Sequence, residues 1–534
     1  MKRWNGWGDD SIESHLTDDG IRLLTEITGE PTPVTDLSYD DALKLVKNSK
    51  LEKFPKADTS KEARLLHSRG QSFPDWLALR QGYQLAFPDA IVTPKDEGEV
   101  RQALRAAEKA KAKVVIYGGG TSVVGHINRP AGNKPVIVLD MSKMDKLIAF
   151  DPISRLAKFQ AGVLGPNIEA QLAPHAMMLG HFPQSYEYST LGGWVAARSS
   201  GQQSLYYGRI EDTFAGGRMI TSTGIIDLPN HPASAAGPDL RQWWLGSEGR
   251  VGVITEATVR VRPIPEKEEF HGVFFPNWLA AEQFVRTAIQ DRLPVSMMRL
   301  SSEHETFVTL ALAGNSSMIK WLERYLSFRR IGIQKCLLIV GFTGQANQVS
   351  TTKKKTMSLA SNFGGVNLGQ KLGQAWKKNR FKGPYLRNKL WDLGWGVDTL
   401  ETALPWNKVG EGVERIESAL HKAAATFNSE KILAYTHLSH LYNSGSALYT
   451  TYVFRLQGDA QKTFKMWQKM KSSASDAIVS LGGTISHQHG VGKDHSAYLA
   501  AEKSKEGMEW LKGWVNHADP KGIFANGSLF GPTK

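Results

Sequence analysis

Three consecutive glycines at the end of an apolar run constrain this chain more than any other feature. The turn Gly118-Gly119-Gly120-Thr121-Ser122 follows the run Val114-Val115-Ile116-Tyr117. Glycine lets the backbone approach a ligand closely, and successive N–H groups in such a turn can converge on phosphate oxygens. The turn therefore indicates a pyrophosphate-binding site, although a strand followed by glycines also occurs at ordinary tight turns.

The residues around the turn predict an α/β layer. Apolar residues between 95 and 112 recur at helical spacing, with Val100, Ala103, Leu104 and Ala107 on one face. A strand is expected directly after this helix, which places the glycine turn at the carboxyl end of a strand, where ligands collect in open α/β layers. The pattern also predicts a helix over residues 278–290 and strands over 113–117, 136–139, 157–163, 336–342 and 447–456.

Two more blocks support the cofactor hypothesis. The first runs from Phe182 to Gly201 and contains Thr190-Leu191-Gly192-Gly193, and the second runs from Trp244 to Thr258. Neither GxGxxG nor GxxxxGK[ST] is present at these positions. In this order and spacing, the three blocks resemble the FAD-binding half of the vanillyl-alcohol-oxidase/PCMH flavoprotein superfamily.

This resemblance implies that FAD is the cofactor and that the three blocks bind it. The covalent tether of the superfamily commonly uses a histidine or cysteine near the glycine turn. Because residues 118–122 contain neither, we expect non-covalent FAD. The expected cofactor contacts are Gly118, Gly119, Gly120, Thr121, Ser122, Pro183, Ser189, Thr190, Gly192, Gly193, Ser199, Glu248, Val253 and Ile254.

The length of 534 residues exceeds one ordinary core and indicates two or three domains. An alternating stretch ends at Pro263 and Pro265, where we expect a domain boundary. The resemblance implies an α+β fold, with a two-part PCMH-type FAD-binding domain, an α+β (ferredoxin-like) substrate cap and helical terminal segments. We expect an N-terminal helical segment at 1–85, the FAD-binding domain at 86–265, the cap at 266–480, and a C-terminal segment at 481–534 that carries active-site histidines and returns to the FAD domain.

Cysteine usage and hydropathy bear on the compartment. Cys336 is the single cysteine, which excludes an intramolecular disulfide framework and fits a reducing compartment. The first residues contain no apolar core of a signal peptide, and no later stretch approaches a membrane span. We therefore expect a cytoplasmic protein.

The net charge of +13 is partly concentrated between residues 353 and 389, where lysines and arginines alternate with aromatic residues. A solvated insertion is the simplest interpretation, and it is favoured over a nucleic-acid site because no nucleic-acid-binding module accompanies the stretch. We expect no nucleic-acid partner. Basic residues mixed with aromatic ones also suit an anionic membrane surface, so peripheral membrane contact remains an open alternative.

Four histidines lie in two short clusters, His437 with His440 and His487 with His489. Imidazole is a common metal ligand, but neither cluster contains a carboxylate or thiol, and Asp494 is the nearest further candidate. We therefore expect no metal, and we favour anion binding or proton transfer by the histidines. If their segment is extended, His487 and His489 share one face.

Across nearly its whole length the chain also resembles one branch of the superfamily, the alkyl-dihydroxyacetonephosphate synthases, which form the ether bond of ether lipids. The resemblance is carried by Trp4-Asn5-Gly6-Trp7-Gly8, Met298-Arg299-Leu300, Glu401-Thr402-Ala403-Leu404-Pro405-Trp406, Leu448-Tyr449 and the segment from Gly482 to Lys493. It implies that Arg299 contacts the substrate, that Tyr449 acts as an acid/base, and that His487 and His489 serve the active site. The middle residue of the family's three-histidine run is Gln488 here, and glutamine cannot titrate. Either the middle role is dispensable or the substrate differs.

The resemblance implies an enzyme that exchanges the acyl group of acyl-dihydroxyacetone phosphate for a fatty alcohol, without net oxidation. Its substrate would be a small molecule or lipid bearing phosphate or carboxylate, and homodimer formation is left open.

Several alternatives remain. One is an FAD-linked dehydrogenase or oxidase of a 2-hydroxy acid or polyol phosphate. Its metal-dependent members typically have glutamate in place of Gln488 and histidine in place of Tyr449, so both residues argue against a metal-bound hydroxy acid. Another alternative is a binding protein without flavin, in which the glycine blocks would serve only as tight turns of the fold. Taken alone, Arg299 could be an ion-paired surface residue and Tyr449 a core tyrosine.

Overall fold

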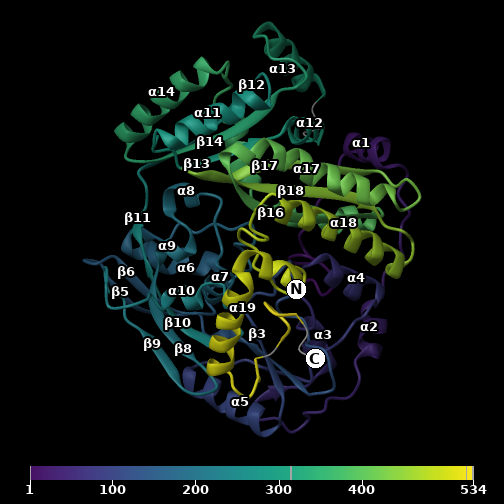
Figure 1. Cartoon of the computed structure of the whole chain (residues 1–534), viewed down its shortest axis with the longest axis vertical. Coiled ribbons are helices and arrows are strands. Elements are labelled where there is room, and N and C mark those ends of the chain that lie inside the picture. Colours follow the sequence, from purple (N-terminus) through teal and green to yellow (C-terminus); the bar gives the residue numbers. More distant parts are fainter. Residues whose placement is uncertain (1, 313–315, 525, 532–534) are drawn as a thin grey trace.

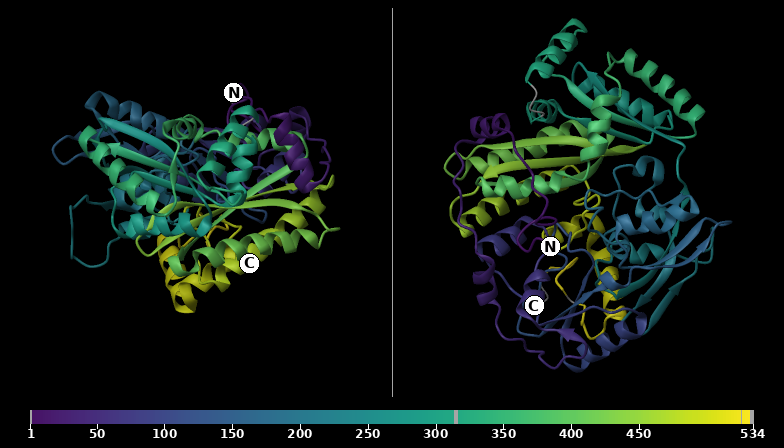
Figure 2. Two further views of the ribbon diagram at one scale, coloured as in Figure 1. Left: turned by 90° about the horizontal axis from the view of Figure 1, so that it is seen from above. Right: turned by 180° about the vertical axis from the view of Figure 1, so that it is seen from behind.

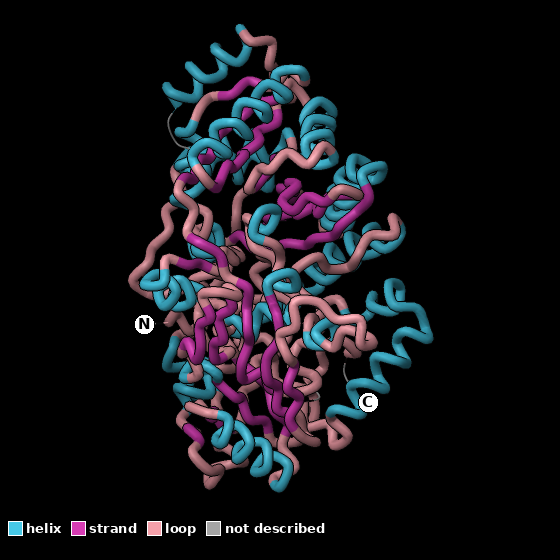
Figure 3. Tube along the Cα trace, turned by 90° about the vertical axis from the view of Figure 1, so that its left-hand side faces the viewer, coloured by secondary structure: helices cyan, strands magenta, loops and turns pink. Residues whose placement is uncertain are grey.

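The computed structural model describes residues 2–312, 316–524 and 526–531. Figure 1 shows two stacked parts: a lower part with two sheets built from the first half of the chain, and an upper part with one large sheet. The view from behind in Figure 2 shows the same division, with terminal segments of the chain beside both parts. In Figure 3 the strands of each part are flanked by helices. None of the described helices is long and apolar enough to cross a membrane.

The first sheet of the lower part carries the glycine turn. It has the order β1-β2-β4-β3, in which β2, β4 and β3 are parallel and β1 is antiparallel. Helix α5 connects β2 to β3 and buries Val100, Ala103, Leu104 and Ala107, which confirms the predicted helix and its apolar face. The strands are β1 (Ala57–Asp58), β2 (Ala90–Val92), β3 (Lys113–Tyr117) and β4 (Val136–Asp140), and the helix is α5 (Glu97–Lys109).

The second sheet of the lower part is antiparallel, with the order β5-β6-β10-β8-β9. Its core includes Phe159, Phe214 and Val259, packed against helices α6 and α7. The strands are β5 (Leu147–Asp151), β6 (Leu156–Gln160), β8 (Phe214–Ile220), β9 (Ile225–Leu228) and β10 (Val253–Arg260), with the pair β7 (Met177–Met178) and β11 (Arg262–Pro263) beside them. The helices are α6 (Gly165–Leu172), α7 (Leu191–Ala197), α8 (Ser204–Tyr207), α9 (Ile210–Thr213) and α10 (Arg241–Trp244).

The upper part is one antiparallel sheet with the order β15-β12-β14-β13-β17-β18-β16. Its strands are β12 (Lys267–Phe275), β13 (Met297–Ser301), β14 (Cys336–Gly344), β15 (Val366–Asn367), β16 (Trp395–Pro405), β17 (Ile432–Tyr442) and β18 (Gly445–Arg455). Its helices are α11 (Trp278–Gln290), α12 (Glu303–Leu312), α13 (Ser316–Phe328), α14 (Ala346–Asn362), α15 (Gln370–Asn379), α16 (Gly383–Asp392), α17 (Trp406–Ala425) and α18 (Ala460–Ser480). The helix predicted over 278–290 is thus confirmed at both ends.

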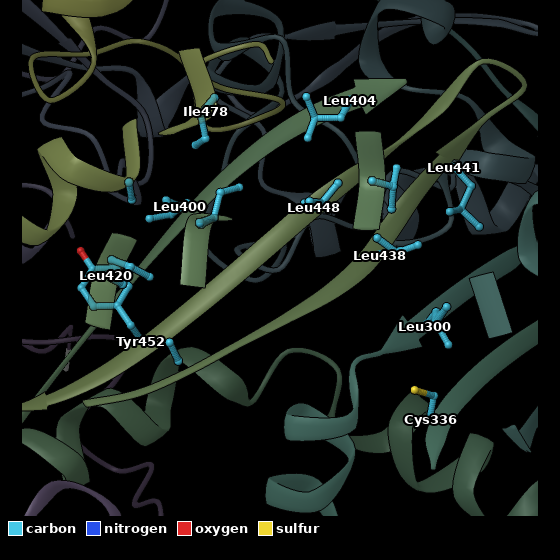
Figure 4. Packing of buried hydrophobic residues seen from close by; sticks show 14 of the residues in the cluster. Leu300, Cys336, Leu400, Leu404, Leu420, Leu438, Leu441, Leu448, Tyr452 and Ile478 are labelled. Carbon is cyan, nitrogen blue, oxygen red and sulfur yellow. The ribbon is translucent and has the colours of Figure 1, made fainter. Parts of the chain in front are cut away.

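The two faces of the upper sheet have different roles. Figure 4 shows Leu300, Leu438 and Leu448 in the cluster that packs under the covering helices. On β13, Met298 and Leu300 belong to this cluster, whereas Arg299 lies on the opposite face. Each fully buried large apolar side chain stabilises the fold by about 1.5–3 kcal/mol. On β13 the alternation therefore places Met298 and Leu300 in the core under the helices and turns Arg299 towards the other face.

The terminal segments pack on both parts. The N-terminal helices are α1 (Asp18–Thr28), α2 (Tyr39–Leu45), α3 (Lys61–Leu66) and α4 (Phe73–Gln81). After α19 (Leu499–Ala518), the chain reaches the first sheet, where Val114 N–H donates to the carbonyl of Ile523 at 2.7 Å. The division at 85/86, 265/266 and 480/481 stays a prediction.

Candidate active site

A cavity of about 610 Å³ lies between the two parts of the molecule. This volume falls within the range of about 300–1,000 Å³ that is usual for ligand pockets. Of the predicted cofactor contacts, the cavity is lined by Gly118, Gly119, Gly120, Thr121, Ser122, Pro183, Ser189, Thr190, Gly192, Gly193, Ser199, Glu248 and Ile254. Val253 lies elsewhere: it packs in the core of the first sheet and pairs with Ile220.

The glycine turn packs directly on the second glycine-rich block. A Cβ at Gly119 would lie 1.4 Å from the carbonyl oxygen of Tyr188, and a Cβ at Gly118 would lie 2.4 Å from the Thr190 hydroxyl. Any other residue would force these segments apart. The resulting cradle brings backbone from both segments to the wall of the cavity, where the N–H groups of a glycine turn can bind phosphate oxygens.

Arg299, on β13, lines the cavity and forms a network with the side chains of Glu305 and His437. It donates to Glu305 at 2.6 Å and lies 3.1 Å from His437 Nδ1. Burial disfavours ionisation of Glu305, but Arg299 and His437 outweigh it and lower the pKa of that carboxyl to about 2. Arg299 is therefore ion-paired, as the simpler interpretation proposed, yet it lines the cavity.

Tyr449, on β18, lies against two of the predicted histidines. Its ring stacks on His437 with centroids 5.0 Å apart and meets His489 edge-on at 5.7 Å. Its hydroxyl donates to Thr399 at 3.3 Å. Burial raises the pKa of Tyr449, and the charge of Glu401 adds to the effect. The hydroxyl therefore keeps its proton near neutral pH.

The histidine segment is held from both sides by buried carboxylates. Glu401 Oε1 accepts the N–H groups of Gln488 at 2.6 Å and His489 at 2.7 Å. Glu248 accepts those of Val491 at 2.5 Å and Gly492 at 2.9 Å. The carboxylate of Glu248 thus holds the protein's own backbone, although the residue also lines the cavity.

The segment forms no strand, so the two histidines have different surroundings. His489 lines the cavity beside Tyr449, whereas His487 is not among the lining residues. His487 stacks on His440 with centroids 4.8 Å apart and contacts Arg209 at 3.1 Å. The cavity therefore brings together Arg299, Tyr449 and His489, with His487 behind them.

Burial decides the charge of these imidazoles. It lowers the pKa of His437 and His489, in the latter against the attraction of Glu401. It lowers the pKa of His440 to about 3. Neutral imidazoles can accept protons or share hydrogen bonds. From the sequence we expect His437 and His440 to support the site rather than to take part in catalysis, and both line the cavity.

Sequence reasoning missed two arginines of the basic stretch. Arg380 and Arg387, at α15 and α16, line the cavity, so the solvated-insertion interpretation is wrong for them. Arg387 lies over the Trp76 ring at 4.5 Å and donates to the carbonyl of Gln71 at 2.9 Å. Within the described residues it makes no ion pair with a carboxylate. The aromatic residues among the basic ones in this stretch were the sequence signal that could have predicted Arg380 and Arg387 as buried site residues.

No metal centre is formed by the described part of the chain: it contains no group of three or more His, Cys, Asp or Glu placed to hold an ion. Cys336 is buried in the upper sheet, where burial raises the pKa of its thiol. The chemistry available at the cavity therefore comes from arginines, neutral histidines and a protonated tyrosine beside the glycine cradle.

Comparisons with known proteins agree with this geometry. Residues 88–228 match the family described as FAD binding domain, and residues 264–529 match FAD linked oxidases, C-terminal domain. The chain is similar to alkyldihydroxyacetonephosphate synthase of Caenorhabditis elegans, with 30% identity over 99% of this chain and 95% of that protein. It is 31% identical to the enzyme of the same name from Dictyostelium discoideum, over 87% of this chain and 76% of that protein.

Solved structures show the same fold. A crystal structure of alkyldihydroxyacetonephosphate synthase matches with a TM-score of 0.83 and 27% identity, covering 98% of this chain and 97% of that one. p-Cresol methylhydroxylase matches with a TM-score of 0.68, 97% and 98% coverage, and 14% identity, which shows the fold alone. The predicted α+β fold with a PCMH-type FAD-binding part is confirmed, and so is FAD as the cofactor.

Proposed function

Because this chain belongs to the alkyldihydroxyacetonephosphate synthase family of FAD-linked oxidases, we propose that it exchanges the acyl group of acyl-dihydroxyacetone phosphate for a fatty alcohol. The products are an alkyl ether of dihydroxyacetone phosphate and a free fatty acid. The observation that carries the proposal is the meeting of Arg299, Tyr449 and His489 in one cavity with the glycine turn. When bound there, FAD would supply the nucleophilic ring through which one oxygen substituent replaces the other.

Two arginines serve the substrate phosphate in this proposal. Arg387 has a half-buried guanidinium with no carboxylate partner among the described residues, so an anionic ligand would complete its charge balance. Arg299 is already paired with Glu305, which fixes the direction of its guanidinium. We assign phosphate binding chiefly to Arg387 and substrate orientation to Arg299.

Tyr449 and His489 handle the protons. The Tyr449 hydroxyl, whose pKa is raised by burial, keeps its own proton, so it can donate a hydrogen bond to the departing carboxylate and relay a proton between the ligand and its neighbours. His489 is neutral because burial lowers its pKa, so its ring can accept the proton removed from the substrate carbon. Glu401 holds His489 by its backbone and keeps the imidazole beside Tyr449. His487 supports this arrangement from behind through His440.

One side of the cavity suits an alkyl chain. Leu386, Leu390, Val397 and Val453 line it near the Tyr435 ring. Burying such a chain stabilises a complex by about 0.8 kcal/mol per CH₂ group. A 2-hydroxy acid or polyol phosphate has no group to fill this side, so the lining favours the lipid substrate over the dehydrogenase alternative.

Peripheral membrane contact is part of the proposal. Trp321 is 65% exposed and Phe328 84% exposed on α13, and Ile333 after it is 90% exposed. Arg329 and Arg330 lie between Phe328 and Ile333 and are exposed. Aromatic and basic residues on one surface suit an anionic membrane. A cytoplasmic location and a homodimer stay predictions.

An anaerobic assay tests the function. The purified protein is mixed with acyl-dihydroxyacetone phosphate and a fatty alcohol, and separately with 2-hydroxy acids and glycerol phosphate, while the flavin spectrum and products are recorded. Ether product and free fatty acid, without accumulation of two-electron-reduced flavin, are expected. Bleaching of the flavin by a hydroxy acid or polyol phosphate with no ether formed would overturn the synthase assignment and leave the dehydrogenase.

A further inference from the structure

The N-terminal segment from Lys2 to Asp9, which we call the N-terminal strap, joins the glycine turn to helix α16. At one end, Lys2 Nζ donates to the carbonyl of Gly119 at 3.3 Å. Near the other, Trp7 N–H donates to Asn388 Oδ1 and the Asn388 amide donates back to the Trp7 carbonyl, both at 3.0 Å. Lys2 also bridges Asp9 as an isolated antiparallel pair. The strap is therefore tied to the FAD-binding part and to the cap.

The glycines of the strap permit its close approach to α16. A Cβ at Gly6 would lie 2.3 Å from Asn388 Oδ1. Gly8 has a φ of +84°, and its Cβ would lie 2.3 Å from the Tyr385 ring. Both positions require glycine, so the sequence Gly6-Trp7-Gly8 places one large side chain between two points of backbone contact.

That side chain lines the site and carries a donor that is buried in the described structure. Trp7 is 4% exposed and lines the cavity. Its ring meets Tyr188 edge-on, with centroids 5.8 Å apart. Its Nε1 is buried and has no hydrogen-bond partner among the described residues. Indole N–H is a donor only, and a buried donor is rarely left without an acceptor.

The surroundings indicate which acceptor is missing. The carbonyl of Tyr188 faces Gly119 of the glycine turn, so the ring that Trp7 contacts belongs to the residue that forms the phosphate cradle. Arg387 precedes Asn388, the residue that holds the strap, and its charge has no carboxylate partner in the described structure. Trp7 therefore lies beside the cradle through Tyr188 and next to the helix that carries Arg387, in a cavity that Trp7 and Arg387 both line. We propose that Trp7 donates its indole N–H to a phosphate oxygen of the bound flavin or of the substrate.

If the phosphate belongs to the substrate, this inference rests on the proposed function. If it belongs to the flavin, the inference requires only that the protein binds FAD. The test replaces Trp7 with phenylalanine (Trp7→Phe), which keeps an aromatic ring and removes the N–H. The matched control is Trp4→Phe in the same strap, because Trp4 packs on Tyr39 and does not line the cavity. The dissociation constants of FAD and of riboflavin, which carries the ring without phosphate, are measured by fluorescence titration of the apoprotein.

If the acceptor is a flavin phosphate, Trp7→Phe weakens FAD binding by about tenfold and leaves riboflavin binding unchanged. If it is the substrate phosphate, the FAD constants stay unchanged and the KM for acyl-dihydroxyacetone phosphate rises by about tenfold at saturating FAD, with kcat nearly constant. Equal weakening of FAD and riboflavin, or no change in any constant beyond twofold, overturns the proposal.

A second variant protects the test against misfolding. Replacement of Trp7 by 3-benzothienylalanine keeps the fused rings and lacks the N–H, so the packing on Tyr188 is retained. The same change in phosphate affinity is expected from both variants, with the melting temperature of the apoprotein unchanged in the second. A normal FAD constant and a normal KM in this second variant also overturn the proposal. Because the FAD constants do not depend on turnover, they remain informative if the synthase assay fails.

Discussion

Glu401 lies against both the backbone and the ring of His489: its Oε1 accepts the backbone N–H of His489 at 2.7 Å and lies 3.5 Å from the imidazole Nδ1. The same oxygen accepts the N–H of Gln488 at 2.6 Å. Strand β16 of the upper sheet thereby positions the histidine segment, although Glu401 and His489 are 88 residues apart in the sequence. The position of the cavity-lining histidine depends on a carboxylate that is itself buried.

Substitution of Glu401 by glutamine should loosen the histidine segment. Hydrogen bonds to charged groups contribute about 1.5–3 kcal/mol each, and the amide is a weaker acceptor than the carboxylate. We expect Glu401→Gln to lower the free energy of unfolding by about 2 kcal/mol and to reduce activity. Urea unfolding measures the first effect, with the exposed Glu411→Gln as control. Equal stability of Glu401→Gln and the unchanged chain would contradict the role of this contact.

Removal of the Tyr449 hydroxyl should slow turnover without loss of cofactor. Acid/base groups contribute about 10²–10⁴-fold to rate, so Tyr449→Phe should lower kcat within that range while KM changes little. Tyr435→Phe is the control, because Tyr435 lines the apolar side of the same cavity. Steady-state kinetics at saturating FAD measures kcat and KM of both variants. A kcat of Tyr449→Phe within threefold of that of the unchanged chain would rule out proton transfer by Tyr449.

Neutralisation of Arg387 should weaken substrate binding. A charge-assisted contact of about 1.5–3 kcal/mol corresponds to a rise in KM of about 10- to 100-fold for Arg387→Gln. The control is Arg415→Gln, whose partner Glu411 lies on an exposed surface. KM is measured at low and high salt. An unchanged KM would assign the substrate phosphate to other groups.

Stability should fall as acid protonates Glu305. Its carboxyl has a pKa of about 2 in the folded chain and 4.5 as the ordinary value, so its contribution is complete above pH 4.5 and is lost as the pH falls towards 2. The pKa of His437 is also lowered in the folded chain, which adds a loss of stability below pH 6.5. Urea unfolding between pH 3 and 7 should show a weaker acid dependence for Glu305→Gln. The exposed Glu414→Gln should leave the curve unchanged, and parallel curves for all three chains would refute the assignment.

Bound flavin should be released by denaturation. Cys336 does not line the cavity, and the predicted contacts in the glycine turn contain no histidine or cysteine. Heating the yellow protein and removing the precipitate should leave all FAD in the supernatant, as measured by absorbance. A yellow precipitate would show a covalent link. Because His126 lines the cavity, His126→Ala would then be the first variant to examine.

Local elements could be predicted because their causes are local. The apolar spacing in residues 278–290 is sufficient for α11, and the alternation that predicts a strand over 157–163 matches the alternating burial of β6. The histidines were different. A strand would have put His487 and His489 on one face, but Glu401 and Glu248 hold the backbone in another path. Neither carboxylate is near that segment in the sequence.

The sequence by itself determined the glycine turn, the helix and strand before it and the helix over residues 278–290, because periodicity and the missing side chains of glycine act over a few neighbouring residues. Its motifs carried the resemblance to the family. Only the tertiary structure decided that Arg387 and Trp7 line the cavity and that the Trp7 N–H is buried without an acceptor among the described residues. Their two segments are joined because Asn388 binds the backbone of Trp7 across 381 residues of chain. Burial and charge balance depend on which distant segments pack together, and no local pattern contains that information.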